Sequence, residues 1–369
     1  MSQGKQRVGI VFGGRSGEHE VSLQSAQSVM EAIDTARFEV VPIAIDKQGH
    51  WLVGEASRRF LATTMPANSD AGDRAVVSSA EVQTGLVPKA ESLRDIDVVF
   101  PVLHGPLGED GTVQGLFELA DLPYVGCGVA ASAVAMDKAL CKDIFAARGF
   151  LQAAFLVVKR RDWRDDPRLV METIENRLGF PVFVKPANLG SSVGINKASE
   201  RANLASAIED AARYDRKLVV EKVVPAAREL EVSVLGNDAP IASLPGEVVP
   251  CHEFYDYAAK YIEPDSELII PAPISDDLTV HIRQLAIDAF QAIDGAGMAR
   301  VDFLLDGETG DLYLNEVNTI PGFTGISMYP KLWQASGLPY PELIDRLIDL
   351  ALERYADKSS SETSYRPKG

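Results

Sequence analysis

The chain has little cysteine and no long apolar run. Its 369 residues include three cysteines, at positions 127, 141 and 251, too far apart for a zinc-type pair or a disulfide framework. This scarcity favours a reducing compartment. No stretch reaches transmembrane length, and the apolar part of MSQGKQRVGIVFGG is too short for a signal peptide. We therefore expect a cytoplasmic protein that does not bind the membrane.

Basic residues are also too few to balance the acids. Lysine and arginine number 36 against 53 aspartates and glutamates, which gives a formal net charge of −17. Such a charge disfavours nucleic acid or an anionic membrane surface as a partner. A small anion could still bind where lysines and arginines gather. The 46% hydrophobic and 24% charged fractions are those of a soluble globular protein, and the length suggests two or three domains.

Strand-like and helix-like segments alternate over the first ~125 residues, which is typical of a parallel sheet with helical crossovers. Strands are predicted at 8–12, 38–45 and 97–103, and later helices near 276–294 and 340–355. The predicted fold class is α/β and α+β, with an N-terminal parallel α/β domain before a two-part fold. We place the domains at 1–126, 127–221 and 222–356, with a disordered tail at 357–369.

The stretch RVDFLLDGETGDLYLNEVNTIPGFTG, residues 300–325, has the alternation and the turn composition of a β-hairpin. If Asp306 lies opposite Leu312, the register places an arginine, two acids and an asparagine on one face: Arg300, Asp302, Glu316 and Asn318. Like charges directly opposite each other destabilise a sheet. A divalent cation would remove that cost, and carboxylate and amide oxygens are the ligands that Mg²⁺ prefers. A solvated hairpin face is the alternative.

A Gly/Ser loop, KPANLGSSVGINK, spans residues 185–197, with Lys185 at its mouth. Its backbone N–H groups could converge on phosphate oxygens. Residues 190–194 also match the G-x-S-x-G elbow of serine hydrolases, which would make Ser192 a nucleophile. That elbow requires a strand, a sharp turn and a helix, whereas INKAS reads as a second strand. A phosphate loop, a flexible surface hairpin and, less favoured, a hydrolase therefore remain open.

Two glycine-rich turns, FGGRSGEHEVS at 12–22 and HGPLGEDG at 104–111, follow predicted strands, where open α/β sheets bind ligands. Glu18, His19 and Glu20 could receive an ammonium group, and His104 is expected at the same sheet edge. The segment EFYDYAAKY at 253–261 sets charged residues among aromatic ones. It reads either as a core segment or as a loop that folds over a ligand.

Together these motifs resemble the D-alanine–D-alanine ligases of the ATP-grasp superfamily. The matching stretches lie between residues 12 and 328 and are SGEHEVS, HGPLGEDG, MDK, KPANLGSSVG, FYDYAAKY, ARVDF and NEVNTIPGFTGISM. The resemblance implies an ATP-grasp fold that holds ATP between two α+β units, with the preceding α/β domain contacting substrate. It also implies a homodimer and a role in peptidoglycan synthesis.

The resemblance implies a role for each matching residue. ATP would lie under the Gly/Ser loop, with Glu221 on adenine and Glu229 on the ribose. The groups implied around the phosphates are Lys138, Lys185, Ser192 and Lys260. Two Mg²⁺ or Mn²⁺ ions would be held by Asp302, Glu316 and Asn318.

The first D-alanine's ammonium would be held by Glu18, which joins Ser191 and Tyr261 in a hydrogen-bonded trio, with His104 nearby. Ser327 and the backbone N–H of Met328 would hold the second D-alanine's carboxylate. Arg300 and the Gly322 N–H are expected to stabilise the tetrahedral oxyanion.

Relatives that form the D-alanyl-D-lactate ester have phenylalanine in place of Tyr261, so this tyrosine favours the dipeptide. A D-alanine–D-serine ligase and a nucleotide-binding regulatory module that has lost catalysis are the remaining alternatives. The regulatory module is disfavoured by four intact residues: Arg300, Asp302, Glu316 and Asn318.

Overall fold

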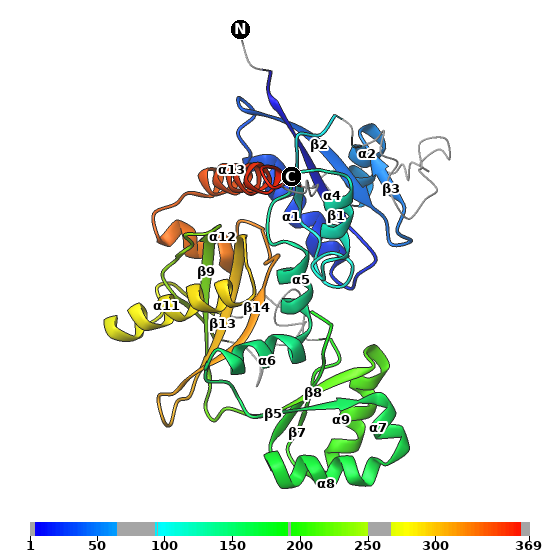
Figure 1. The fold of residues 1–369 in the computed structure, drawn as a ribbon, viewed down its shortest axis with the longest axis vertical. Helices are drawn as coiled ribbons and strands as arrows, with labels where there is room; N and C mark the ends of the chain where they lie inside the picture. Colours follow the sequence, from blue (N-terminus) through cyan, green and yellow to red (C-terminus); the bar gives the residue numbers. More distant parts are fainter. Residues whose placement is uncertain (1–3, 65–92, 94, 191–192, 250–266, 363–369) are drawn as a thin grey trace, which may run out of the picture.

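The computed structural model describes residues 4–64, 93, 95–190, 193–249 and 267–362. The strands in these ranges form three sheets, which follow one another along the long axis of the molecule (Figure 1). No helix in the described part of the chain is long and apolar enough to cross a membrane.

The N-terminal sheet has the strand order β3-β2-β1-β4. Its central strand β1 is parallel to β2 and β4, as predicted, while the edge strand β3 is antiparallel to β2. The run Val8–Phe12 is apolar throughout apart from one glycine, and it is buried, because helices cover both faces of the sheet. The elements of this unit are β1 (Gln6–Gly13), α1 (His19–Ala32), β2 (Phe38–Ile45), β3 (Trp51–Val53), α2 (Glu55–Thr64), β4 (Val98–Pro101) and α4 (Thr112–Leu119).

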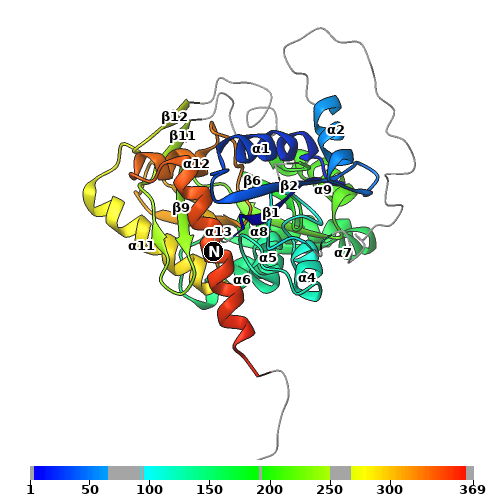
Figure 2. The ribbon, with the colours of Figure 1, turned by 90° about the horizontal axis from the view of Figure 1, so that it is seen from above.

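One face of this first sheet is covered by the last helix of the chain, α13 (Tyr340–Ser359) (Figures 1 and 2). Leu343, Leu347 and Ile348 of α13 are fully buried in one core with Val8 and Phe100. The predicted helix at 340–355 is therefore present but longer. It continues to Ser359, so the segment predicted to be a disordered tail begins as helix.

The second sheet is antiparallel, with the order β5-β8-β6-β7. Strands β6 and β7 form the two arms around the Gly/Ser loop, as predicted. A serine hydrolase elbow needs a helix where β7 stands, so this alternative loses its structural context. The elements are β5 (Phe155–Lys159), α7 (Arg160–Asp165), α8 (Pro167–Leu178), β6 (Val182–Pro186), β7 (Asn196–Ala198), α9 (Arg201–Tyr214) and β8 (Lys217–Lys222).

The third sheet has the order β12-β11-β9-β13-β14, with β10 beside β9. The predicted helix at 276–294 is α11, which Ser275 caps by accepting a hydrogen bond from the Leu278 N–H. The elements are β9 (Arg228–Gly236), β10 (Ile241–Ala242), β11 (Gly246–Val249), β12 (Glu267–Ile269), α11 (Asp276–Ala292), β13 (Gly297–Leu305), β14 (Leu312–Asn318) and α12 (Met328–Ala335).

Two helices, α5 (Val129–Met136) and α6 (Lys138–Ala147), precede the second sheet in sequence but pack on the third. Ala131, Ala135 and Phe145 share a core with Val232 and Val301 of the third sheet. The predicted domain limits stay a prediction. Helices α5 and α6 fall within the second predicted domain but pack on the third sheet. Helix α13 lies mostly within the third predicted domain but packs on the first sheet.

The β13–β14 hairpin contains a bulge that the predicted register did not include. Leu305, and not Asp306, lies opposite Leu312. A register shift between Asp302 and Phe303 then leaves Asn315 as the extra residue, and the pairs Arg300–Asn318 and Asp302–Glu316 form as predicted. The bulge thus restores the register at the end of the hairpin that carries the acids.

Candidate active site

A row of three acids crosses the third sheet. Asp302 on β13 pairs in register with Glu231 on β9 and with Glu316 on β14. Registered neighbours point to the same face of a sheet, so three carboxylates meet there. The hairpin prediction contained two of them. Glu231 was not among the predicted site residues, and it is buried.

Arg300 neutralises part of this row. Its Nε and Nη2 donate to the two oxygens of Asp302, both at 2.7 Å, and Nε lies 3.0 Å from Glu231 Oε2. Burial alone would lower the pKa of Arg300, but Asp302 and Glu231 raise it well above its usual value. Nη1 takes no part in these contacts. The predicted mutual repulsion of the acids is therefore relieved first by an arginine.

Asn318 and Glu316 provide oxygens on the far side of the same row. Asn318 Oδ1 is buried and accepts no hydrogen bond from the described residues, and Glu316 Oε2 lies 3.4 Å from Lys138 Nζ. A buried carbonyl oxygen without a donor beside two carboxylates fits a hard divalent cation. Within the described residues, no group of three or more His, Cys, Asp or Glu side chains has metal-binding geometry by itself. The fit therefore depends on the asparagine.

Lys138 connects the Gly/Ser loop with the acidic row. Asp137 caps α6 by accepting from the Leu140 N–H and pairs with Lys217, so the start of the helix is fixed. The Lys138 backbone N–H donates to Ala187 O at 2.9 Å, and its Nζ donates to Leu189 O at 3.0 Å. One lysine thus contacts the loop and lies 3.4 Å from Glu316 of β14.

A second cluster lies across the small sheet, where Glu221 stands between two lysines. Lys185 Nζ contacts Glu221 Oε2, and Lys142 Nζ lies 3.0 Å from Oε1. Burial alone would raise the pKa of Glu221, but Lys142 and Lys185 lower it to about 2. Burial opposes the charge of Lys185 as well, and Glu221 nevertheless raises its pKa. Glu221 and Lys185 are therefore ionised near neutral pH.

The two glycine-rich turns of the N-terminal unit bring a pair of acids to the Gly/Ser loop. A Cβ atom on Gly190 would lie 3.0 Å from Glu18 Oε2 and 3.5 Å from Glu109 Oε1. Glu109 also accepts from the Gly105 N–H at 2.9 Å. Burial, and then the charge of Glu18, raise the pKa of Glu109 to about 8. Two carboxyl groups so close to each other suit an ammonium group.

His104 joins the N-terminal unit to the segment after β14. Its Nδ1 is 2.9 Å from Ile320 O, and its Nε2 is 3.3 Å from Ser25 Oγ. Burial lowers the pKa of His104, so the ring is neutral, with Nδ1 donating to the carbonyl. Ser25 Oγ also accepts from the Phe323 N–H at 3.4 Å. The predicted sheet-edge position of His104 thus lies against residues 320–323.

The segment 322–328 forms a turn that ends at α12. Ser327 Oγ lies 2.7 Å from Thr324 Oγ1 and accepts from the Thr324 N–H at 3.1 Å. A Cβ atom on Gly322 would lie 3.0 Å from Ser327 Oγ, and this tight approach explains the glycine. Met328 is the buried first residue of α12, where backbone N–H groups lack helix partners and suit an anion.

The structure thus gathers the predicted residues that it describes from all three sheets. Glu229 on β9 is one of the acids that raise the pKa of Lys185. Ser191, Ser192, Lys260 and Tyr261 lie outside the described residues, as does the segment 253–261.

Three buried residues of the site were absent from the predicted set: Lys142, Glu109 and Glu231. Lys142 is the fourth residue after Lys138, which was predicted to bind phosphate, and it could have been found as a helix neighbour because positions i and i+4 share a face. Glu109 lies within a motif that was already singled out, HGPLGEDG.

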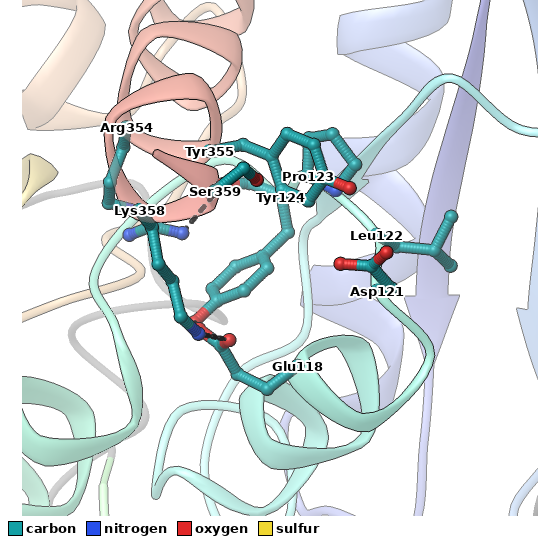
Figure 3. A pocket seen from close by; sticks show the side chains of 9 residues that line it. All are labelled: Glu118, Asp121, Leu122, Pro123, Tyr124, Arg354, Tyr355, Lys358 and Ser359. Atoms are coloured by element: carbon teal, nitrogen blue, oxygen red, sulfur yellow. Dashed lines mark hydrogen bonds and ion pairs between the residues drawn. The ribbon is translucent and has the colours of Figure 1, made fainter. Parts of the chain in front are cut away.

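A cavity of about 150 Å³ lies elsewhere, between the end of α4, residues 121–124 and the end of α13 (Figure 3). Arg354 lies 4.3 Å from the Tyr124 ring centroid and donates to Tyr124 O, while Lys358 pairs with Glu118. Within this lining the Lys358 and Glu118 charges pair with each other, and none of the lining residues is a predicted site residue.

Comparisons with known proteins agree with this geometry. Residues 7–127 match the family model described as D-ala D-ala ligase N-terminus, and residues 144–349 match D-ala D-ala ligase C-terminus. A protein of Heliobacterium modesticaldum named D-alanine--D-alanine ligase is 53% identical over 99% of both chains. One of the same name from Geobacillus kaustophilus is 49% identical over 98% of this chain and 99% of its own.

Solved structures give the same result. The D-alanine-D-alanine ligase from Coxiella burnetii is 38% identical, with a TM-score of 0.79 and 96% of each chain covered. The VanG D-Ala:D-Ser ligase from Enterococcus faecalis is 34% identical, with a TM-score of 0.81, over 94% of this chain and 100% of its own. These likenesses confirm the predicted fold class and the ATP-grasp architecture. Because both family models and full-length relatives match, the chain belongs to the D-alanine–D-alanine ligase family.

Proposed function

We propose that this protein joins two D-alanine molecules into D-alanyl-D-alanine for peptidoglycan synthesis, with ATP converted to ADP and phosphate. The observation that carries this proposal is the position of Lys138, which contacts the Gly/Ser loop and approaches the acidic row of the third sheet. A phosphate chain held at that point would lie between the nucleotide loop and the metal-binding oxygens. Membership of the family supports the use of ATP and a divalent metal.

A free carboxylate is a poor electrophile, so the reaction requires activation. The γ-phosphoryl group is transferred to the first D-alanine's carboxylate, which gives an acyl phosphate and ADP. The second D-alanine's amine then attacks the acyl carbon, and phosphate leaves as the amide forms. Lys138 and Lys185 orient the phosphates. Two divalent ions held by Asp302, Glu316 and Asn318 would neutralise phosphate charge, and positioning supplies most of the remaining rate.

The N-terminal turns and the segment 322–328 hold the two amino acids in this proposal. Glu18 receives the ammonium group of the first D-alanine, and Glu109 beside it provides a second carboxyl group. Ser327 and the Met328 N–H hold the second carboxylate. Arg300, anchored by Asp302, and the Gly322 N–H stabilise the tetrahedral oxyanion. One such donor typically contributes about 3–4 kcal/mol of transition-state stabilisation.

Several parts of the proposal rest on the family resemblance alone. Ser191 and Tyr261 would form the hydrogen-bonded trio with Glu18, and Ser192 and Lys260 would contact phosphate. A cytoplasmic location and a homodimer belong to the same group of expectations.

The second substrate is the main open choice. The likeness to a D-Ala:D-Ser ligase of known structure makes D-serine the second candidate, whereas the curated relatives named here are D-alanine--D-alanine ligases. Tyr261 argues against D-lactate. Substitution of Tyr261 by phenylalanine should admit D-lactate, and an unchanged product ratio would remove this tyrosine from the specificity argument.

The test is to incubate the protein with ATP, Mg²⁺ and D-alanine and to measure phosphate and dipeptide together. Parallel reactions contain D-serine or D-lactate as the second substrate. We expect equal amounts of phosphate and D-alanyl-D-alanine. Absence of both with D-alanine, or a preference for D-serine, would overturn the assignment.

A further inference from the structure

Glu221 stands at the centre of a row across the small sheet. In the register of β5, β8 and β6, it lies directly between Phe155 and Phe183. Side chains of registered neighbours project from the same face, so the carboxylate stands between two phenyl rings. Glu221 is 3% exposed, and such a position is costly for a charge unless it is paired.

Two lysines provide the pairing, one for each carboxylate oxygen. Lys142 comes from α6 and Lys185 from β6. The Lys142 ammonium lies 5.4 Å from the centroid of Phe155, and that of Lys185 lies 5.9 Å from the centroid of Phe183. Both distances are within the range of cation–π attraction. The sheet and α6 thus enclose the two lysines and Glu221 beside the two phenyl rings.

The two lysines have different surroundings. The Lys142 side chain is 3% exposed, against 13% for Lys185. Lys185 leads into the Gly/Ser loop, and under the proposed function its charge is shared with the phosphates of ATP. Lys142 lies one helical turn beyond Lys138, on the same face of α6. It therefore remains the counter-ion of Glu221 when nucleotide is bound.

One oxygen of Glu221 is still able to accept. Oε1 is buried, and no hydrogen bond of good geometry reaches it from the described residues, although the Lys142 ammonium pairs with it electrostatically. An ionised carboxylate only accepts hydrogen bonds, whereas a protonated one also donates. The pKa of about 2 that burial, Lys142 and Lys185 together give Glu221 agrees with the ionised form.

We infer that Lys142 is a positioning residue that keeps Glu221 an ionised acceptor and thereby selects a purine with an amino group at C6. This inference rests on the proposed function and on the contact with adenine that the family resemblance implies for Glu221. The adenine amino group donates to the carboxylate. A purine without a substituent at C6 loses that bond, and hypoxanthine or guanine presents an oxygen that the carboxylate repels.

The test compares ATP with purine riboside triphosphate and ITP in the Mg²⁺-dependent reaction with D-alanine. Hydrogen bonds to charged groups correspond to roughly 10- to 100-fold in kcat/KM, so wild type should prefer ATP over purine riboside triphosphate by that factor. In Lys142→Met this preference should fall to about 2-fold or less, through a higher KM for ATP with kcat nearly unchanged. The exposed Lys159 of β5, changed to methionine, is the matched control and should keep the wild-type ratio.

Removal of Lys142 alone leaves a buried carboxylate with a single lysine, so thermal melting must show that the variant is folded. If it is not, the pair Lys142→Met with Glu221→Gln replaces both charges and relieves the unpaired charge. The preference for ATP should be lost in this variant too.

The inference is overturned if folded Lys142→Met, or the double variant, keeps the wild-type preference for ATP over purine riboside triphosphate. It is also overturned if the wild type uses these two triphosphates equally. By contrast, a wild type that makes no dipeptide from ATP and D-alanine overturns the proposed function itself.

Discussion

At the scale of single residues, the site holds two buried carboxyl groups that differ in protonation near neutral pH: Glu221 is ionised and Glu109 is largely protonated. Two lysines lower the pKa of Glu221 to about 2 despite its burial. Burial and the neighbouring Glu18 raise that of Glu109 to about 8. The difference arises from the neighbours, since both side chains are almost fully buried.

Glu109 should make stability depend on pH in a way that Glu109→Gln removes. The native pKa of about 8 exceeds the ordinary value of 4.5, so the folded state binds the proton more tightly. Stability is therefore lost as pH rises between these two values, by at most about 1.4 kcal/mol per pH unit. Glutamine still accepts from the Gly105 N–H and does not titrate. Melting of metal-free, nucleotide-free protein should show the variant gaining on wild type between about pH 5 and pH 8; a constant difference would contradict the assignment.

Glu316→Gln should lose turnover and keep its fold. The Glu316 side chain is 32% exposed and lies 3.4 Å from Lys138 Nζ, and a partly exposed ion pair of this kind contributes little to stability. Because the Glu316 carboxylate would be a metal ligand, its replacement by glutamine should lower kcat by about 100-fold or more. Asp302→Asn is the contrasting variant, since it also breaks the buried pair with Arg300 and should lower the unfolding free energy by a few kcal/mol. Phosphate release and melting measure both effects, and wild-type turnover in Glu316→Gln would exclude a metal role.

At the scale of elements, the start of α6 determines where Lys138 lies. Asp137 caps this helix and pairs with Lys217 of β8. Asp137→Ala should lower the unfolding free energy by about 1 kcal/mol more than Asp137→Asn, because asparagine remains a good cap but loses the charge. Both variants should raise the KM for ATP, and alanine more so. Urea denaturation measures the unfolding free energy, and initial rates measure the KM for ATP. Equal stability of the two variants would show that the cap is unimportant.

The β13–β14 hairpin shows which part of the site the sequence could predict. Alternation and turn composition identified the hairpin and its pairs of polar residues, because side-chain direction follows a period of two. They could not reveal the bulge at Asn315, since a one-residue shift depends on contacts with the rest of the sheet. Nor could local pattern identify Glu231, because its partners lie far along the chain, on β13.

The whole molecule was the hardest scale to predict. The sequence order of the elements suggested consecutive domains, whereas α13 completes the core of the first sheet and α5 and α6 pack on the third. Periodicity identifies the apolar face of a helix but does not name the surface that this face covers. The family resemblance supplied the architecture that such patterns lack.

The packing of α13 on the N-terminal sheet predicts that the two ends of the chain unfold together. Leu347 is fully buried in the shared core, so Leu347→Ala should lower the unfolding free energy by about 2–5 kcal/mol. Asp349 on the same helix pairs with Arg37 where both side chains are 43% exposed, and Asp349→Asn should change stability by about 0.5 kcal/mol or less. Hydrogen exchange should then show β1 amides less protected in Leu347→Ala and unchanged in Asp349→Asn, because opening of the helix exposes the strand beneath it. Full protection of β1 in a destabilised Leu347→Ala would mean that the helix and the sheet open independently.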